Sequence, residues 1–163
     1  MIWLPNLLTL GNLLCGLAAI AVSMTGDWTK ACLLILASVI FDGADGWAAR
    51  RLHHETRFGA FFDSAADFIS FGLAPVFIFH ASRGNLRFLV MLGLVFYVAA
   101  SAFRLVRFHA EYRRPRKNGF QGLPTTASAF IFVSSLWILP SAWTLWVLSF
   151  LMISRIPFPR PIS

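Results

Sequence analysis

Residues 30–50, KACLLILASVIFDGADGWAAR, form a long apolar run that ends in two aspartates, a glycine and an arginine. The run is long enough to cross the ~30 Å hydrocarbon core of a bilayer as an α-helix, because each residue adds about 1.5 Å. Asp42 and Asp45 lie near one end of this helix, and charged groups at membrane depth are costly and usually functional. The stretch therefore predicts a membrane-spanning helix with a functional site near its end.

The composition of the whole chain agrees with a membrane protein. Of 163 residues, 58% are hydrophobic and 13% are charged, whereas a soluble domain has about 25% charged residues. Mean hydropathy is +0.70. These values exclude an ordinary cytosolic globule, a disordered chain and a disulfide scaffold. They predict an all-α, polytopic integral membrane protein, in which Cys15 and Cys32 are small buried residues.

Apolar runs outside residues 30–50 set the number of helices. Further spans are expected at residues 4–24, 59–80 and 86–106. The remaining run, 125–153, is interrupted at Pro140 and predicts two short helices, with one long kinked helix as the alternative. The sequence thus predicts six transmembrane helices in a single membrane domain, residues 1–163, and five if the last run is continuous.

The basic residues predict the orientation. Lys and Arg concentrate in residues 50–57, 104–117 and 155–160, while only Lys30, Arg83 and Arg87 fall on the other side of the predicted spans. Cytoplasmic loops are enriched in Lys and Arg. We therefore expect a protein of the cell (inner) membrane whose termini and active site are cytoplasmic. The net charge of +7 is then a topology signal, and no nucleic-acid partner is expected.

Four of the seven acidic residues lie within or near the predicted spans. Asp42 and Asp45 are spaced i, i+3, and Asp63 and Asp67 are spaced i, i+4, so each pair shares one helix face. A short connection would bring the two faces together. Four carboxylates on neighbouring helices predict a site for hard divalent cations, Mg²⁺ or Mn²⁺, and two such ions can clamp a phosphate.

The residues around these acids suit a phosphate ligand. Gly46 and Ala49 leave room for a ligand, and Arg50 offers a planar fork for a diphosphate. Gly59 allows close helix packing. The alternative interpretation is a structural ion-pair cluster of the aspartates with the nearby arginines, Arg50, Arg51 and Arg57.

Together these residues form a specific pattern: Asp42-Gly-Ala-Asp45-Gly46-Trp-Ala-Ala49-Arg50, eight residues, Gly59, three residues, Asp63, three residues, Asp67. The pattern resembles the signature of the CDP-alcohol phosphatidyltransferase family. Flanking segments are similar to the phosphatidylserine synthase branch of that family, namely residues 5–16, 70–75, 103–105, 120–124 and 152–159. His109 and Thr126 depart from the pattern of this branch.

The resemblance implies roles for individual residues. Asp42 and Asp63 would bridge two metal ions, Asp45 would complete the first metal site and Asp67 the second. Asp67 would also be the general base. Gly46 and Ala49 would face the cytidine, Arg50 would hold the diphosphate and Thr56 would approach the nucleotide. A helix face of polar residues would line the nucleotide pocket: Asn6, Thr9 and Asn12. Arg104 and Arg107 are expected either to bind the acceptor or to anchor the helix at the cytoplasmic surface.

The implied reaction transfers the phosphatidyl group of CDP-diacylglycerol to L-serine and releases CMP. The implied partners are these two substrates, the lipid bilayer and a second copy of the chain in a homodimer. Two alternatives stay open. One is the same chemistry with glycerol 3-phosphate, inositol phosphate or choline as the acceptor. The other is a divalent-cation channel or transporter that uses the four aspartates as its binding site.

Overall fold

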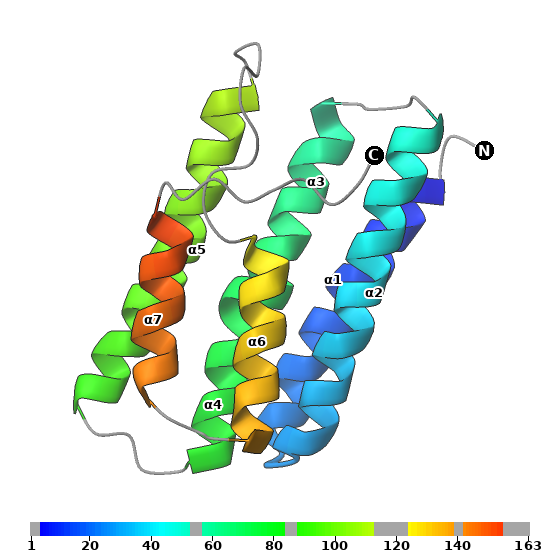
Figure 1. Ribbon diagram of the computed structural model, residues 1–163. Coiled ribbons are helices and arrows are strands. Elements are labelled where there is room, and N and C mark those ends of the chain that lie inside the picture. Colours follow the sequence, from blue (N-terminus) through cyan, green and yellow to red (C-terminus); the bar gives the residue numbers. More distant parts are fainter. Residues whose placement is uncertain (1–3, 53–56, 84–87, 113–123, 139–141, 155–163) are drawn as a thin grey trace. The chain divides into compact units, whose positions relative to one another are not determined.

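The structure is a computed structural model that describes residues 4–52, 57–83, 88–112, 124–138 and 142–154. Every regular element in these ranges is helical, which confirms the predicted all-α fold (Figure 1). The helices group into two compact units, residues Met1–Leu86 and Arg87–Ser163. Each unit is described by itself, and the single membrane domain remains a prediction.

The first unit contains two long helices and one helix of three consecutive parts. The long helices are α1 (Leu4–Met24) and α2 (Trp28–Leu52), and the parts of the third are α3 (Arg57–Asp67), the π-helix η1 (Phe68–Leu73) and α4 (Ala74–Arg83). In η1 the wider turn is visible in its last bond, where the backbone N–H of Ala74 reaches the carbonyl oxygen of Ile69. π-Helical turns inside α-helices often lie at functional sites.

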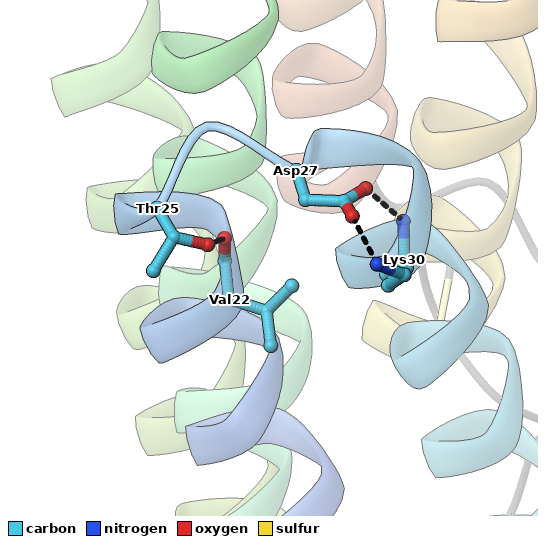
Figure 2. A network of polar contacts seen from close by, with 4 residues as sticks. All are labelled: Val22, Thr25, Asp27 and Lys30. Carbon is cyan, nitrogen blue, oxygen red and sulfur yellow. Dashed lines mark hydrogen bonds and ion pairs between the residues drawn. The ribbon is translucent and has the colours of Figure 1, made fainter.

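A tight turn joins α1 to α2 and makes them antiparallel neighbours (Figure 1). Gly26 adopts φ +88°, a left-handed conformation that favours glycine after a helix C-terminus. Asp27 then caps α2, since its Oδ1 accepts the backbone N–H of Lys30 at 3.1 Å. Figure 2 shows this cap, the ion pair between Asp27 and Lys30, and the bond from the Thr25 hydroxyl to the carbonyl oxygen of Val22.

Helix α1 is the centre of the first unit, because it packs against α2, α3, η1 and α4. At Gly16 it comes close to Ser70 of η1. A Cβ added to Gly16 would lie 2.8 Å from the Cα of Ser70, so only glycine fits this crossing without displacing backbone. Small residues at such positions are typical of packed membrane helices.

The second unit contains α5 (Phe88–Tyr112), α6 (Thr125–Ile138) and α7 (Ala142–Ile153). Helix α7 packs against both α5 and α6. The rings of Phe96 and Trp146 stack with centroids 5.6 Å apart, and the buried Tyr97 hydroxyl lies 3.3 Å from the Ser128 hydroxyl.

Among the residues that the structure describes, four helical stretches are long and apolar enough to cross a membrane: Pro5–Met24, Trp28–Ala48, Gly59–Arg83 and Phe88–Arg107. Large apolar side chains on them are exposed, for example Leu14 and Leu33, as expected for surfaces that face lipid. This confirms a polytopic membrane protein. The predicted interruption of the last apolar run is also confirmed, since α6 and α7 are separate helices that run in opposite directions (Figure 1). With 14 and 12 residues they are shorter than a full span of about 20, so the count of six spans stays a prediction.

Candidate metal and substrate site

Three of the four predicted aspartates come together in the first unit. Asp42 is contributed by α2, and Asp63 and Asp67 by α3. Each offers one carboxylate oxygen, and these three oxygens lie within 4.8 Å of one another. The two helices that carry the acids both pack against α1. The i, i+4 spacing of Asp63 and Asp67 thus has the predicted consequence that both face Asp42.

The geometry of these three oxygens is suitable for a hard divalent cation. Oxygen ligands of Mg²⁺ and Ca²⁺ lie at about 2.0–2.6 Å from the ion, so two ligands of one ion are separated by at most ~5 Å. All three carboxylates are half-buried. In addition, Asp63 Oδ1 is buried and has no hydrogen-bond partner within the part of the chain that the structure describes. The donor set therefore fits a bound cation.

Asp45 has a different environment from the other three. Its side chain is buried, and its Oδ2 accepts a hydrogen bond of 3.0 Å from the Thr9 hydroxyl of α1. The same hydroxyl lies 3.0 Å from the carbonyl oxygen of Pro5, so its one proton is shared between two acceptors. Asp45 is not part of the three-oxygen group, and its role as a metal ligand stays a prediction.

Asn12 of α1 contacts the second acidic helix. Its Nδ2 donates a hydrogen bond of 3.1 Å to Asp67 Oδ1. Asn12 and Thr9 are both buried, and each donates to one aspartate of a different pair. Sequence reasoning assigned both residues to a nucleotide pocket and missed these bonds. Their spacing of three residues places them on one helix face, and this is the signal that could have connected them to the two acidic helices.

The residues predicted to bind the CDP group are only partly described. Gly46 is half-buried in α2, and Asn6 is half-buried in α1. Ala49 and Arg50 belong to α2, but the structure does not describe their side chains. Thr56 is not among the described residues. The roles of these residues stay predictions.

The two arginines predicted for acceptor binding lie in α5 of the second unit. Arg104 Nη1 donates a 3.0 Å hydrogen bond to the Thr125 hydroxyl of α6. Arg107 Nη1 donates a 3.4 Å bond to the carbonyl oxygen of Ile153, at the end of α7. Both arginines therefore tie helices of their own unit together, and their role in acceptor binding stays a prediction.

The fold and the acidic cluster define the class: an all-helical membrane protein with a candidate divalent-cation site. Residues 2–154 match the CDP-alcohol phosphatidyltransferase family. The chain therefore belongs to the CDP-alcohol phosphatidyltransferase family. The predicted family is confirmed, and with it the prediction that the chain is a transferase.

Similar proteins carry related names. An archaetidylserine synthase of Methanothermobacter thermautotrophicus is 35% identical over 96% of this chain and 70% of its own length. A CDP-diacylglycerol–serine O-phosphatidyltransferase of Helicobacter pylori is 35% identical over 79% of this chain, which spans 55% of that relative. Another of the same name, from Bacillus subtilis, is 31% identical over 97% of this chain and 90% of its own length.

Proposed function

We propose that this chain transfers the phosphatidyl group of CDP-diacylglycerol to the hydroxyl of L-serine and releases CMP. Membership of the CDP-alcohol phosphatidyltransferase family supports a CDP-activated donor. The names of the relatives from H. pylori and B. subtilis support serine as the acceptor. The observation that carries the proposal is the group of Asp42, Asp63 and Asp67, whose oxygens lie within 4.8 Å of one another near the end of two membrane helices.

The proposed cofactors are two divalent ions, Mg²⁺ or Mn²⁺. We assign Asp42 and Asp63 to both ions, Asp45 to the first and Asp67 to the second. This assignment uses oxygen ligands only, which hard cations prefer. Bound there, the ions would neutralise the diphosphate and stabilise the charge that develops on the leaving CMP.

Asp67 is the proposed general base. It accepts the proton of the serine hydroxyl while the serine oxygen forms a bond to the phosphorus that carries the lipid. The bond between this phosphorus and the oxygen of the CMP phosphate breaks, and CMP leaves with the electron pair. A positioned base of this kind contributes roughly 10²–10⁴-fold to the rate, because a serine hydroxyl is a weak nucleophile at neutral pH.

The remaining residues are assigned to substrate binding. Gly46 and Ala49 leave space for the cytidine, and Arg50 binds the diphosphate. Thr56 and Asn6 approach the nucleotide, whereas the bonds of Thr9 and Asn12 to the aspartates favour a role in holding the acids. For Arg104 and Arg107 the proposal keeps both predicted roles, binding of the acceptor and anchoring of their helix at the cytoplasmic surface. We place this site at the cytoplasmic face of the cell membrane, in a homodimer.

A CMP-release assay with the purified full chain tests the proposal. CDP-diacylglycerol, with ester- or ether-linked tails, is combined with labelled serine, glycerol 3-phosphate, inositol phosphate or choline, each with Mg²⁺ or Mn²⁺. We expect CMP release that depends on serine and a labelled lipid product. Release only with another alcohol would reject serine as the acceptor. Metal flux in vesicles without any CMP release would favour the channel or transporter and reject the enzyme.

A further inference from the structure

A buried hydrogen-bond network surrounds Asn12 inside the first unit. The Asn12 side chain is fully buried, and its Nδ2 donates to Asp67 Oδ1 at 3.1 Å. Its Oδ1 accepts a bond from the Ser38 hydroxyl of α2, which also lies 3.2 Å from the Asn12 carbonyl oxygen. The Ser70 hydroxyl of η1 donates to the same carbonyl oxygen at 3.1 Å. One residue of α1 thus connects α2, α3 and η1.

The chemistry of these partners fixes the orientation of the Asn12 amide. An ionised carboxylate only accepts hydrogen bonds, so Asp67 requires the amide nitrogen of Asn12. The Ser38 hydroxyl donates to the opposite end, the amide oxygen. Rotation of the amide by 180° would place its oxygen against the carboxylate of Asp67 and lose that bond, whereas the Ser38 hydroxyl could accept from the rotated nitrogen and donate to the Asn12 carbonyl oxygen. The carboxylate of Asp67 therefore selects the orientation of the Asn12 amide, and the bond from the Ser38 hydroxyl to the amide oxygen supports it.

From this network we infer that Asn12 is a positioning residue for Asp67, an inference that rests on the proposed function. By donating to Oδ1, Asn12 fixes the rotation of the carboxylate that is proposed to take the proton of the acceptor hydroxyl. Because the amide is neutral, it orients the carboxylate without cancelling its negative charge. An arginine or lysine at this position would instead compete with a bound cation.

The π-helix is part of the same arrangement. η1 begins directly after Asp67 and contains Ser70, and Gly16 of α1 permits the close approach at which Ser70 reaches the Asn12 carbonyl. Buried polar groups in membrane helices are expensive unless they are hydrogen-bonded. A network of three buried polar side chains that ends on one carboxylate is therefore more than packing requires, since apolar residues would fill the same space.

The test compares variants of the full chain in steady-state kinetics and in Mn²⁺ binding followed by electron paramagnetic resonance. For Asn12→Ala we expect kcat to fall about 10–100-fold, with the KM for CDP-diacylglycerol changed less than about threefold. The dissociation constant for Mn²⁺ should rise by about tenfold. Ser38→Ala keeps the amide but removes the bond to its oxygen, so it should lower kcat by a smaller factor, and it tests the inference if Asn12→Ala does not fold.

The matched control is Ser23→Ala. Ser23 is also a buried polar residue of α1, but among the described residues its hydroxyl bonds only to the carbonyl oxygen of Ile20 within the helix. This variant should keep kcat, KM and Mn²⁺ binding within about twofold of wild type.

Three results would overturn the inference for Asn12. These are an unchanged kcat and Mn²⁺ affinity, a raised KM with kcat intact, or a loss in Ser23→Ala equal to that in Asn12→Ala. A raised KM alone would indicate direct nucleotide binding. If wild type shows no CMP release at all, the proposed function fails, and the Mn²⁺ measurement still decides whether Asn12 holds Asp67.

Discussion

Helix α2 has acidic residues at both of its ends, and the two ends differ in what compensates their charge. At the N-terminus, Asp27 accepts the backbone N–H of Lys30 and forms an ion pair of 2.7 Å with the Lys30 ammonium group. The hydrogen bond from the Lys30 side chain, then that from its backbone, lowers the pKa of the Asp27 carboxyl. The negative charge of Asp27 is thus compensated by Lys30 within one helical turn, and both side chains are in contact with water.

At the other end of α2, the acids lie among other acids. Asp45 and Asp67 accept hydrogen bonds from neutral donors, Thr9 and Asn12. Asp63 Oδ1 is buried without a hydrogen-bond partner among the described residues. Neutral donors orient a carboxylate but do not neutralise it, and like charges held together are unfavourable. Among the described residues, the acid at the first end is therefore compensated within the chain, whereas the acids at the second end form a group that fits the proposed cation.

Removal of divalent cations should have the largest effect. Chelation of the purified chain should lower CMP release by more than about a hundredfold, because the ions stabilise the charge on the diphosphate and on the leaving CMP. Readdition of Mg²⁺ or Mn²⁺ should restore the rate, which excludes irreversible unfolding. Full turnover in the chelated protein would show that the acids around Asp63 do not need a cation.

Substitution of the proposed base should have the next largest effect. In Asp67→Asn the new side chain still offers an oxygen to Asn12 Nδ2, so the fold should be kept while proton acceptance is lost. We expect turnover to fall about 10²–10⁴-fold, with CDP-lipid binding largely retained. Kinetics and equilibrium binding of the CDP-lipid measure the two effects separately. Near-normal CMP production would assign the base elsewhere.

Local patterns in the sequence predict most of the helices and a group of four acids, of which the structure brings three together. The first predicted span, residues 4–24, coincides with α1, and the interruption near Pro140 separates α6 from α7. The i, i+4 spacing of Asp63 and Asp67 predicts their shared face. These features depend on neighbours within one or two helical turns, and such neighbours are visible in a sequence.

The partners of Thr9 and Asn12 could not be predicted in the same way. Their bonds join residues 36 and 55 positions apart, Thr9 with Asp45 and Asn12 with Asp67. These pairs depend on how α1 packs against α2 and α3, and contacts between such distant parts of the chain are not visible in local sequence patterns. The π-helix η1 was also missed, because its residues follow the same apolar pattern as an α-helix. Ser38 and Ser70 each lie one helical turn from an acid, and this spacing is the feature of the sequence that could have indicated the network.

A substitution at the crossing of α1 and η1 should have a moderate effect on both stability and turnover. In Gly16→Ala the new Cβ would lie 2.8 Å from Ser70 Cα, so the two backbones must separate. Overpacking of this kind costs about 1–3 kcal/mol, and it would also displace Asp67 relative to Asn12. The thermal midpoint in detergent should fall, and turnover should fall with it.

The stability control for this variant is Gly43→Ala. A Cβ at Gly43 meets no atom within 4 Å, and alanine is the better helix former, so the midpoint should stay equal or rise. An equal loss of stability in both variants would show that the close crossing is not the cause.

The smallest effect is expected at the first end of α2. Asn is as good a helix cap as Asp, so Asp27→Asn keeps the bond to the Lys30 backbone and loses only an exposed ion pair, which contributes little. Turnover should stay within about twofold of wild type.

The pKa of Asp27 is lowered in the folded state, so its ionised form contributes to the stability of the fold. This contribution to stability is present above the ordinary pKa of Asp27 and is lost as the pH falls through the lowered value. Any difference in thermal midpoint between wild type and Asp27→Asn should therefore be present at neutral pH and disappear on acidification. A loss of turnover comparable to that in Asp67→Asn would mean that both ends of α2 serve the same site, and the contrast between them would no longer hold.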